Sequence, residues 1–187
     1  MEQKRFFGGR FIGLILVLAI VGGYFLIKQK TNNENQNNFP KSHKDTTYDI
    51  DGLSVTLVNG YAEQEAVPNS SEKIITNYFG NESRGDLNGD GLEDIAFLIT
   101  QTSGGTGTFY YVVAAIQIPV ENMGYMGTNA ILLGDRISPQ TTEIKNGELI
   151  VNYADRLPGE PMSARPSQGI STYLKVQDNQ LLKLILP

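Results

Sequence analysis

Two short turn sequences constrain the fold most strongly in this chain of 187 residues. Asp51-Gly52 and Asn146-Gly147 each lie between two runs that contain β-branched and other apolar residues. Both dipeptides favour a two-residue hairpin turn, because such a turn needs a positive φ at its central positions. We therefore predict two β-hairpins, with strands over 48–50 and 53–57 and over 142–145 and 148–153.

Other apolar runs extend this pattern. Phe109–Ile118 is long and apolar enough for a helix, but its aromatic and β-branched residues favour a central strand. Ala130–Leu133 predicts a further strand, and 173–176 and 181–186 predict a third hairpin around Gln177–Gln180. We find no convincing internal repeat, so a propeller is not expected.

One segment has the spacing of a helix. Ser70 or Ser71 can cap its N-terminus, and Ile74, Ile75 and Tyr78 recur on one helical face. The expected fold class is therefore mainly β: a compact, mostly antiparallel, sandwich-like domain with one short helix.

An uncharged run of seventeen residues near the N-terminus, 11–27, is long enough to cross a bilayer. Basic residues flank it on both sides: Lys4, Arg5, Arg10, Lys28 and Lys30. A cleaved signal peptide is the alternative, but Val21-Gly22-Gly23 before Tyr24 is a weak cleavage site. We expect an uncleaved single-pass anchor, a transmembrane helix over 11–27 that follows a short cytoplasmic basic segment over 1–10.

The remaining chain divides by composition. Residues 28–46 are rich in Asn, Gln and Lys and predict a flexible polar linker, which contains the only histidine, His43. Residues 47–187 are long enough for one β-rich domain with a substantial core. The chain has no cysteine, which excludes disulfides, thiolate metal sites and lipoprotein processing.

Charge is polarised along the chain. Residues 1–44 carry 7 basic and 2 acidic side chains, a net charge of +5, whereas residues 45–187 carry 8 basic and 18 acidic ones, a net of −10. An acidic domain is unsuited to binding nucleic acid through its general field, and it favours divalent cations.

The sharpest chemical pattern is the Asp-x-Asn-x-Asp-Gly-x-x-Asp run over 86–94. Oxygen-bearing groups at alternate positions can converge on one hard cation, and Gly91 permits the sharp turn between them. An acidic turn that binds nothing is the alternative. The predicted calcium ligands are Asp86, Asn88, Asp90, the Leu92 carbonyl and Asp94.

The residues after this run separate it from an EF-hand. Position 12 is Phe97 where an EF-hand has a bidentate glutamate, and Ile95–Thr100 predicts a buried strand where an EF-hand continues as a helix. Over about residues 85–99 the run resembles the calcium loops of FG-GAP, VCBS and related β repeats. The resemblance implies a calcium ion that braces a β fold, and it implies no particular activity.

A wider resemblance rests on the order of three motifs. The calcium-type loop is followed by Gly-Thr-Gly-Thr-Phe-Tyr-Tyr up to Tyr111 and by Gly-Asp-Arg at 134–136. In this order the chain resembles a group of small bacterial membrane-anchored envelope proteins, over most of residues 75–170. The resemblance implies an extracytoplasmic location for the domain, and so does the N-terminal position of the anchor.

Charged residues also gather on predicted loops, at Asp135-Arg136, at Asp155-Arg156 and over 160–167. Ion pairs that staple strand ends together are the expected role of such groups, and a surface for a protein or glycan ligand is the alternative.

Catalysis is poorly supported. No histidine follows position 43 and no cysteine is present, so Ser-His-Asp, Cys-His and histidine-zinc chemistry are excluded from the predicted domain. We expect a non-enzymatic, membrane-anchored extracytoplasmic calcium-binding β domain that serves as a binding or envelope-structural module. The alternative is a surface carbohydrate-binding protein, or a glycan hydrolase that uses two carboxylates.

Overall fold

The computed structural model describes residues 39–67, 69–120 and 124–185. The cytoplasmic segment and the transmembrane anchor predicted over 1–10 and 11–27, and the linker up to residue 38, lie outside these ranges. Within the described part of the chain, no helix has the length and apolar character needed to cross a bilayer.

The described residues form twelve strands and one short 3₁₀ helix, η1 (His43–Asp45). The strands are β1 (Thr47–Ile50), β2 (Leu53–Thr56), β3 (Tyr61–Glu65), β4 (Lys73–Gly85), β5 (Asp94–Ser103), β6 (Phe109–Gln117), β7 (Tyr125–Gly127), β8 (Ile131–Asp135), β9 (Ser138–Lys145), β10 (Glu148–Asp155), β11 (Gln168–Gln177) and β12 (Gln180–Lys183). All pairings between these strands are antiparallel. The prediction of a mainly β, antiparallel fold is therefore confirmed.

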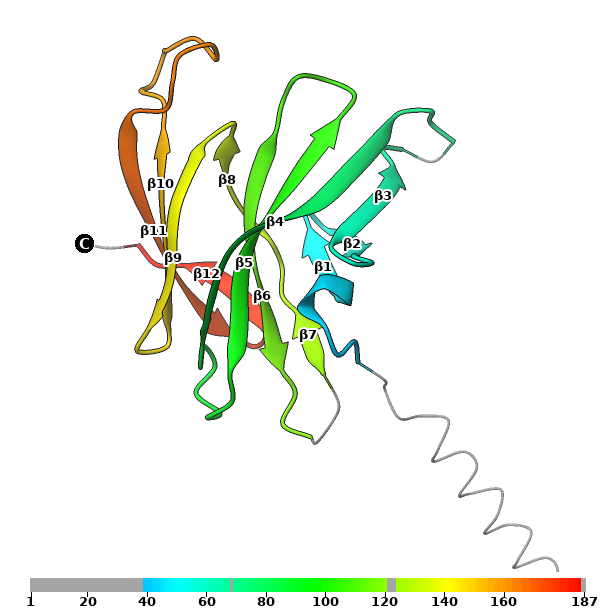
Figure 1. The fold of residues 1–187 in the computed structure, drawn as a ribbon, viewed down its shortest axis with the longest axis vertical. Coiled ribbons are helices and arrows are strands. Elements are labelled where there is room, and N and C mark those ends of the chain that lie inside the picture. The colour runs from blue at the N-terminus through cyan, green and yellow to red at the C-terminus, as the bar shows by residue number, and fades with distance from the viewer. Residues whose placement is uncertain (1–38, 68, 121–123, 186–187) are drawn as a thin grey trace, which may run out of the picture. The chain divides into compact units, whose positions relative to one another are not determined.

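The strands form three sheets (Figure 1). A six-stranded sheet has the order β3-β4-β5-β6-β7, with β8 also paired to β6. A four-stranded sheet has the order β12-β11-β10-β9, and β1 and β2 form a separate hairpin. The hairpin strands predicted on both sides of Asp51-Gly52 and Asn146-Gly147 pair as expected, with positive φ values of 53° and 82° in the first turn and 53° and 77° in the second.

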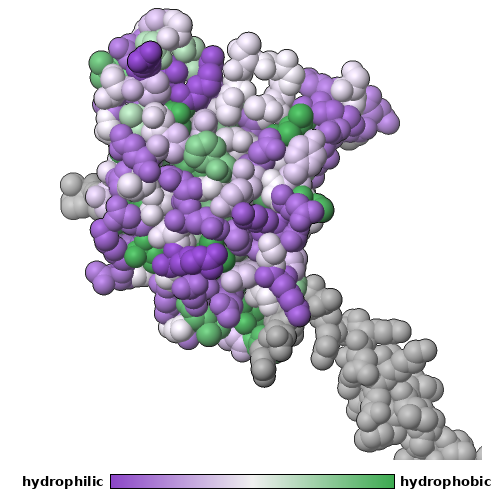
Figure 2. Space-filling model, viewed as in Figure 1, coloured by the Kyte–Doolittle hydropathy of each residue, from purple (hydrophilic) through white to green (hydrophobic). Residues whose placement is uncertain are grey.

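Two hydrophobic cores lie on opposite faces of the six-stranded sheet. Side chains of β5 and β6 alternate between them, so that Leu98 and Val112 face the four-stranded sheet while Phe97 and Val113 face the β1–β2 hairpin. Because both faces of these central strands are covered, their sequences are continuously apolar rather than alternating. Figure 2 shows that hydrophilic residues predominate on one outer face, where hydrophobic residues form separate small patches.

The helix predicted over 70–78 is wrong, because residues 73–85 form the strand β4. Ile75 pairs with Glu63 of β3 on one side and with Thr102 of β5 on the other. The run Ile74-Ile75-Thr76 is β-branched throughout, and pairing on both sides satisfies its backbone groups. Ile74, Ile75 and Tyr78 are half-buried residues of this strand and do not form a helical face.

The folded unit also begins earlier than the predicted domain boundary at residue 47, with Phe39. Residues 39–46, expected as linker, pack on the sheets: His43 is 9% exposed and Thr46 is 2% exposed. The backbone of this segment is bonded as well, since Tyr125 donates its N–H to the Pro40 carbonyl at 2.9 Å and Leu57 donates to the Thr46 carbonyl at 3.1 Å. The polar composition of residues 39–46 gave no signal of this packing in the sequence.

Candidate metal centre between β4 and β5

The loop of the predicted calcium site joins the end of β4 to the start of β5, where Gly85 pairs with Asp94. Leu87 is buried at 3% exposure in the core between the six-stranded and four-stranded sheets. Asn88, Gly89, Asp90 and Gly91 are exposed. The loop is therefore anchored by an apolar side chain near its start, and its tip projects into solvent.

Asp94 anchors the other end of the loop. Its carboxylate is fully buried, and its two oxygens accept hydrogen bonds from the Leu87 N–H and the Gln117 N–H, each at 2.9 Å. Burial raises the pKa of the Asp94 carboxyl, and the N–H groups of Gln117 and Leu87 oppose this rise. Asp94 thus ties the loop to the end of β6, a strand that is 23 residues away in the sequence.

The exposed loop residues are organised by side-chain to backbone hydrogen bonds. The Asp86 carboxylate accepts from the Gly89 N–H at 2.7 Å and from the Gly91 N–H at 2.9 Å. The Asn88 carbonyl accepts from the Asp90 N–H at 3.0 Å, and Asp90 accepts from the Leu92 N–H at 2.8 Å. The N–H groups of Gly91 and Gly89 lower the pKa of Asp86, so its carboxylate stays charged in this arrangement.

The chemistry of the donor set fits a hard cation, because every predicted ligand is an oxygen atom. A carboxylate oxygen has two lone pairs, so one that accepts a backbone N–H can still face a cation. Asp94 differs from Asp86 and Asp90 because it is fully buried beneath the loop, which favours ligation through water for that residue. Among the described residues, no three acidic or histidine side chains gather closely enough to hold a metal ion.

A hollow with a volume of about 290 Å³ lies beside the loop. Two predicted ligands, Asn88 and Asp90, form part of its wall. Most of the other lining side chains are apolar, and they include Phe39, Ile116, Ile118 and Met126. A group that enters this hollow therefore meets the polar loop on one side and an apolar surface on the other.

The charged side chains at Asp135-Arg136 and Asp155-Arg156 bind neighbouring loops and strand ends, as their charge pattern predicts. The Arg156 side chain is only 9% exposed, and its guanidinium donates to the carbonyls of Ala164 at 2.8 Å and Arg136 at 3.1 Å. Asp135 binds Arg136 at 2.9 Å and accepts the Thr108 N–H at 2.8 Å. Their hydrogen-bonding groups are used to hold loops together, and the predicted ligand surface at these loops stays a prediction.

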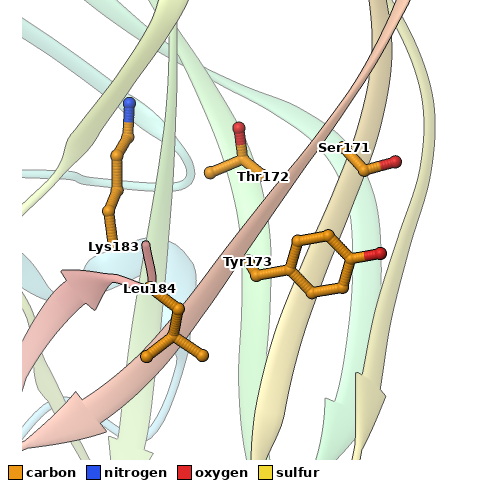
Figure 3. A pocket seen from close by; sticks show the side chains of 5 residues that line it. All are labelled: Ser171, Thr172, Tyr173, Lys183 and Leu184. Carbon is orange, nitrogen blue, oxygen red and sulfur yellow. The ribbon is translucent and has the colours of Figure 1, made fainter. Parts of the chain in front are cut away.

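A second hollow, of about 240 Å³, lies over β11 and β12 and is shown in Figure 3. The hydroxyls of Ser171 and Tyr173 point to one side of β11, whereas Thr172 and Lys183 lie on the other side (Figure 3). These polar groups do not converge on one point, so the hollow has no preferred position for a ligand.

Sequence reasoning missed the surroundings of His43, which it placed in a flexible linker. The ring of this histidine lies between those of Tyr78, Phe97 and Tyr125, with centroid distances of 6.0, 5.1 and 6.5 Å. An isolated histidine in a polar, asparagine-rich segment gives no signal of such burial.

No protein-family model, curated protein or solved structure matches this chain. Function is therefore inferred from the residues of the site and from their surroundings.

Proposed function

We propose that this protein is a membrane-anchored extracytoplasmic β domain that holds one calcium ion in the loop over 86–94 and serves as a binding or envelope-structural module. The ligands are Asp86, Asn88, Asp90 and the Leu92 carbonyl, with Asp94 contributing through water. The observation that carries the proposal is the anchoring of this loop by buried Asp94, which keeps exposed oxygen donors on a fixed base.

Calcium in this loop has a structural role. The carboxylates of Asp86, Asp90 and Asp94 belong to one short turn and repel one another without a cation. A bound divalent ion reverses that repulsion and strengthens the connection between β4 and β5, the two strands on either side of the loop.

The hollow beside the loop supports a binding role, because Asn88 and Asp90 line it together with apolar side chains. Partners with both apolar and oxygen-bearing groups fit such a surface, which includes protein segments and glycans. Nucleic acid is disfavoured by the net charge of −10 over residues 45–187.

The anchor rests on the uncharged run over 11–27, which is long enough to span a bilayer. We expect the full-length protein to fractionate with membranes, and an external protease to release a fragment that begins in the Asn-rich stretch before Phe39. Recovery of a soluble mature protein that starts near Tyr24 would contradict the anchor but leave the calcium site untouched.

Calcium binding is tested by thermal unfolding. Extracellular calcium modules bind with dissociation constants of roughly 10⁻⁴ to 10⁻³ M, so about 10 mM free calcium stabilises the fold by about 1.4 to 2.7 kcal/mol. The melting temperature should rise with calcium and much less with magnesium, whose small octahedral shell fits a flexible oxygen loop poorly. Asp90→Ala is the matched variant, because it removes a ligand from an exposed position without removing core volume.

A glycan array, combined with an assay for released sugar, tests the carbohydrate-active alternative. Glycan binding without turnover supports a lectin-like module, and turnover would mean a carboxylate-dependent hydrolase.

A further inference from the structure

The only histidine of the chain lies where the polypeptide enters the folded domain. His43 begins η1, and Ser42 caps this helix by accepting the Lys44 N–H at 3.1 Å. His43 is buried at 9% exposure, and its ring lies against Tyr78 of β4, Phe97 of β5 and Tyr125 of β7. A titratable ring is therefore one of the side chains that the segment 39–46 buries in the domain.

The imidazole has one charged partner within contact distance. Its Nε2 atom lies 2.6 Å from a carboxylate oxygen of Glu82, whose negative charge favours the protonated ring. The Glu82 side chain is 28% exposed and also lies 3.9 Å from the Arg84 guanidinium, so its charge is shared and partly screened. The other groups that face the ring or its helix are Lys44, Asp45, Tyr48, Tyr78 and Tyr125.

The segment around His43 is held by a small number of further bonds. The Pro40 carbonyl accepts from Tyr125, the Lys44 carbonyl accepts from Gly60 at 2.7 Å, and Asp45 accepts the Asn59 N–H at 2.7 Å. Tyr48 donates its hydroxyl to the His43 carbonyl at 2.7 Å. These bonds lie at one boundary of the domain, on both sides of His43 in the sequence.

We propose that His43 is a proton-sensitive latch that holds the segment 39–46 on the domain as the neutral imidazole and releases it when the ring is protonated. Release frees eight residues, which extend by at most about 26 to 29 Å. If the chain is anchored through residues 11–27, release lengthens the connection between membrane and domain, and that consequence rests on the proposed function. The latch itself does not depend on the anchor or on calcium.

Burial determines the direction of this switch. Burial lowers the pKa of His43; the Glu82 carboxylate raises it, while the positive charges of Lys44 and Arg84 lower it further. The net pKa is below its ordinary value of about 6.5. The latched state therefore prefers the neutral ring: it is fully stable above about pH 6.5, and its stability is lost as the pH falls from there toward the lowered pKa.

Nuclear magnetic resonance of the full chain in detergent micelles tests the latch. A single histidine gives one set of ring signals, so a titration between pH 8 and pH 4.5 reports the pKa of His43 without ambiguity. We expect that pKa to lie below 6.5. Amide exchange of Tyr125 and Gly60, corrected for intrinsic rates, should accelerate over the same pH range. The acceleration should reach up to about tenfold for each pH unit by which the pKa of His43 lies below 6.5.

Two variants separate the latch from general acid unfolding. His43→Gln stays neutral at every pH, so the acid-induced acceleration at Tyr125 and Gly60 should disappear. Glu82→Gln removes the carboxylate that favours the protonated ring. The acceleration should still begin near pH 6.5, but it should continue to lower pH and become larger. Amides of β10, on the other sheet, serve as the control and should not accelerate in parallel.

Three results would overturn the proposal. A pKa of His43 at or above 6.5 would mean that the pair with Glu82 locks the segment when protonated. Equal acceleration at β10 would mean global unfolding. Unchanged acceleration in His43→Gln would assign the pH response to other groups. If His43→Gln does not fold, Glu82→Gln decides: an unchanged or smaller acceleration at Tyr125 and Gly60 in this variant would contradict the proposal.

Discussion

Replacement of Asp94 tests whether this carboxylate braces the loop independently of any metal. Asp94→Ala removes the acceptor of two backbone N–H groups, those of Leu87 and Gln117. A buried donor left without a partner costs about 1–3 kcal/mol. The Gln117 end is only half-buried and recovers part of its bonding with water, so we expect a loss of about 2–4 kcal/mol in the free energy of unfolding.

The measurement is unfolding of a fragment that starts at Phe39, by urea and by heat, monitored by circular dichroism. A chelator is present throughout. For a domain of this size the expected loss lowers the melting temperature by about 6 to 13 °C. Asp94→Asn keeps one acceptor oxygen and should lose less than Asp94→Ala. The urea dependence should keep its slope, because the variant does not change the surface exposed on unfolding.

Asp90→Ala is the control, because Asp90 is exposed and its partners can bond to water. With a chelator present we expect this variant to stay within about 0.5 kcal/mol of the wild type. If Asp94→Ala proves no more destabilising than Asp90→Ala under these conditions, then Asp94 is no brace and our interpretation of its burial is wrong.

Three further outcomes follow from the packing and electrostatics. Leu98→Ala leaves a cavity between the six-stranded and four-stranded sheets and should cost about 2–5 kcal/mol, measured by urea unfolding. Asn129→Ala removes both bonds to the Leu181 backbone, so hydrogen exchange should accelerate in β12 before it does in β10. Burial opposes but does not outweigh the bonds from Arg136 and the Thr108 N–H, so the pKa of Asp135 lies below its ordinary value. Stability should therefore fall as the pH drops below about 3.8 toward that lowered pKa, and Asp135→Asn should weaken the fall in melting temperature.

Local chemistry made the hairpins predictable. Asp51-Gly52 and Asn146-Gly147 adopt the positive φ values that their residue types favour, and the neighbouring runs pair across them. The third predicted hairpin also forms, with Gln177 paired to Gln180 around a two-residue turn, but its second strand ends at Lys183 and not at residue 186. In each case the signal and the structure it predicts lie within a few residues of each other.

Long-range packing explains what the sequence could not reveal. Segment 73–85 is a strand because β3 and β5 pair on both of its sides, and neither partner is visible in the local spacing of its apolar residues. His43 lies in a polar run whose burial depends on Tyr78, Phe97 and Tyr125, all distant in sequence. The spacing of residues in the loop predicted the candidate ligands. The hydrogen bond from the Gln117 N–H to Asp94 joins residues far apart in the sequence, so only the folded structure reveals that Asp94 braces the loop.

Calorimetric titration of calcium into the fragment that starts at Phe39 tests the central claim most directly. We expect one site with a dissociation constant of roughly 10⁻⁴ to 10⁻³ M, and no binding by the Asp90→Ala variant under the same conditions. Absence of binding by the wild type up to several millimolar calcium, or equal binding by Asp90→Ala, would contradict the proposal and leave the loop as an acidic turn.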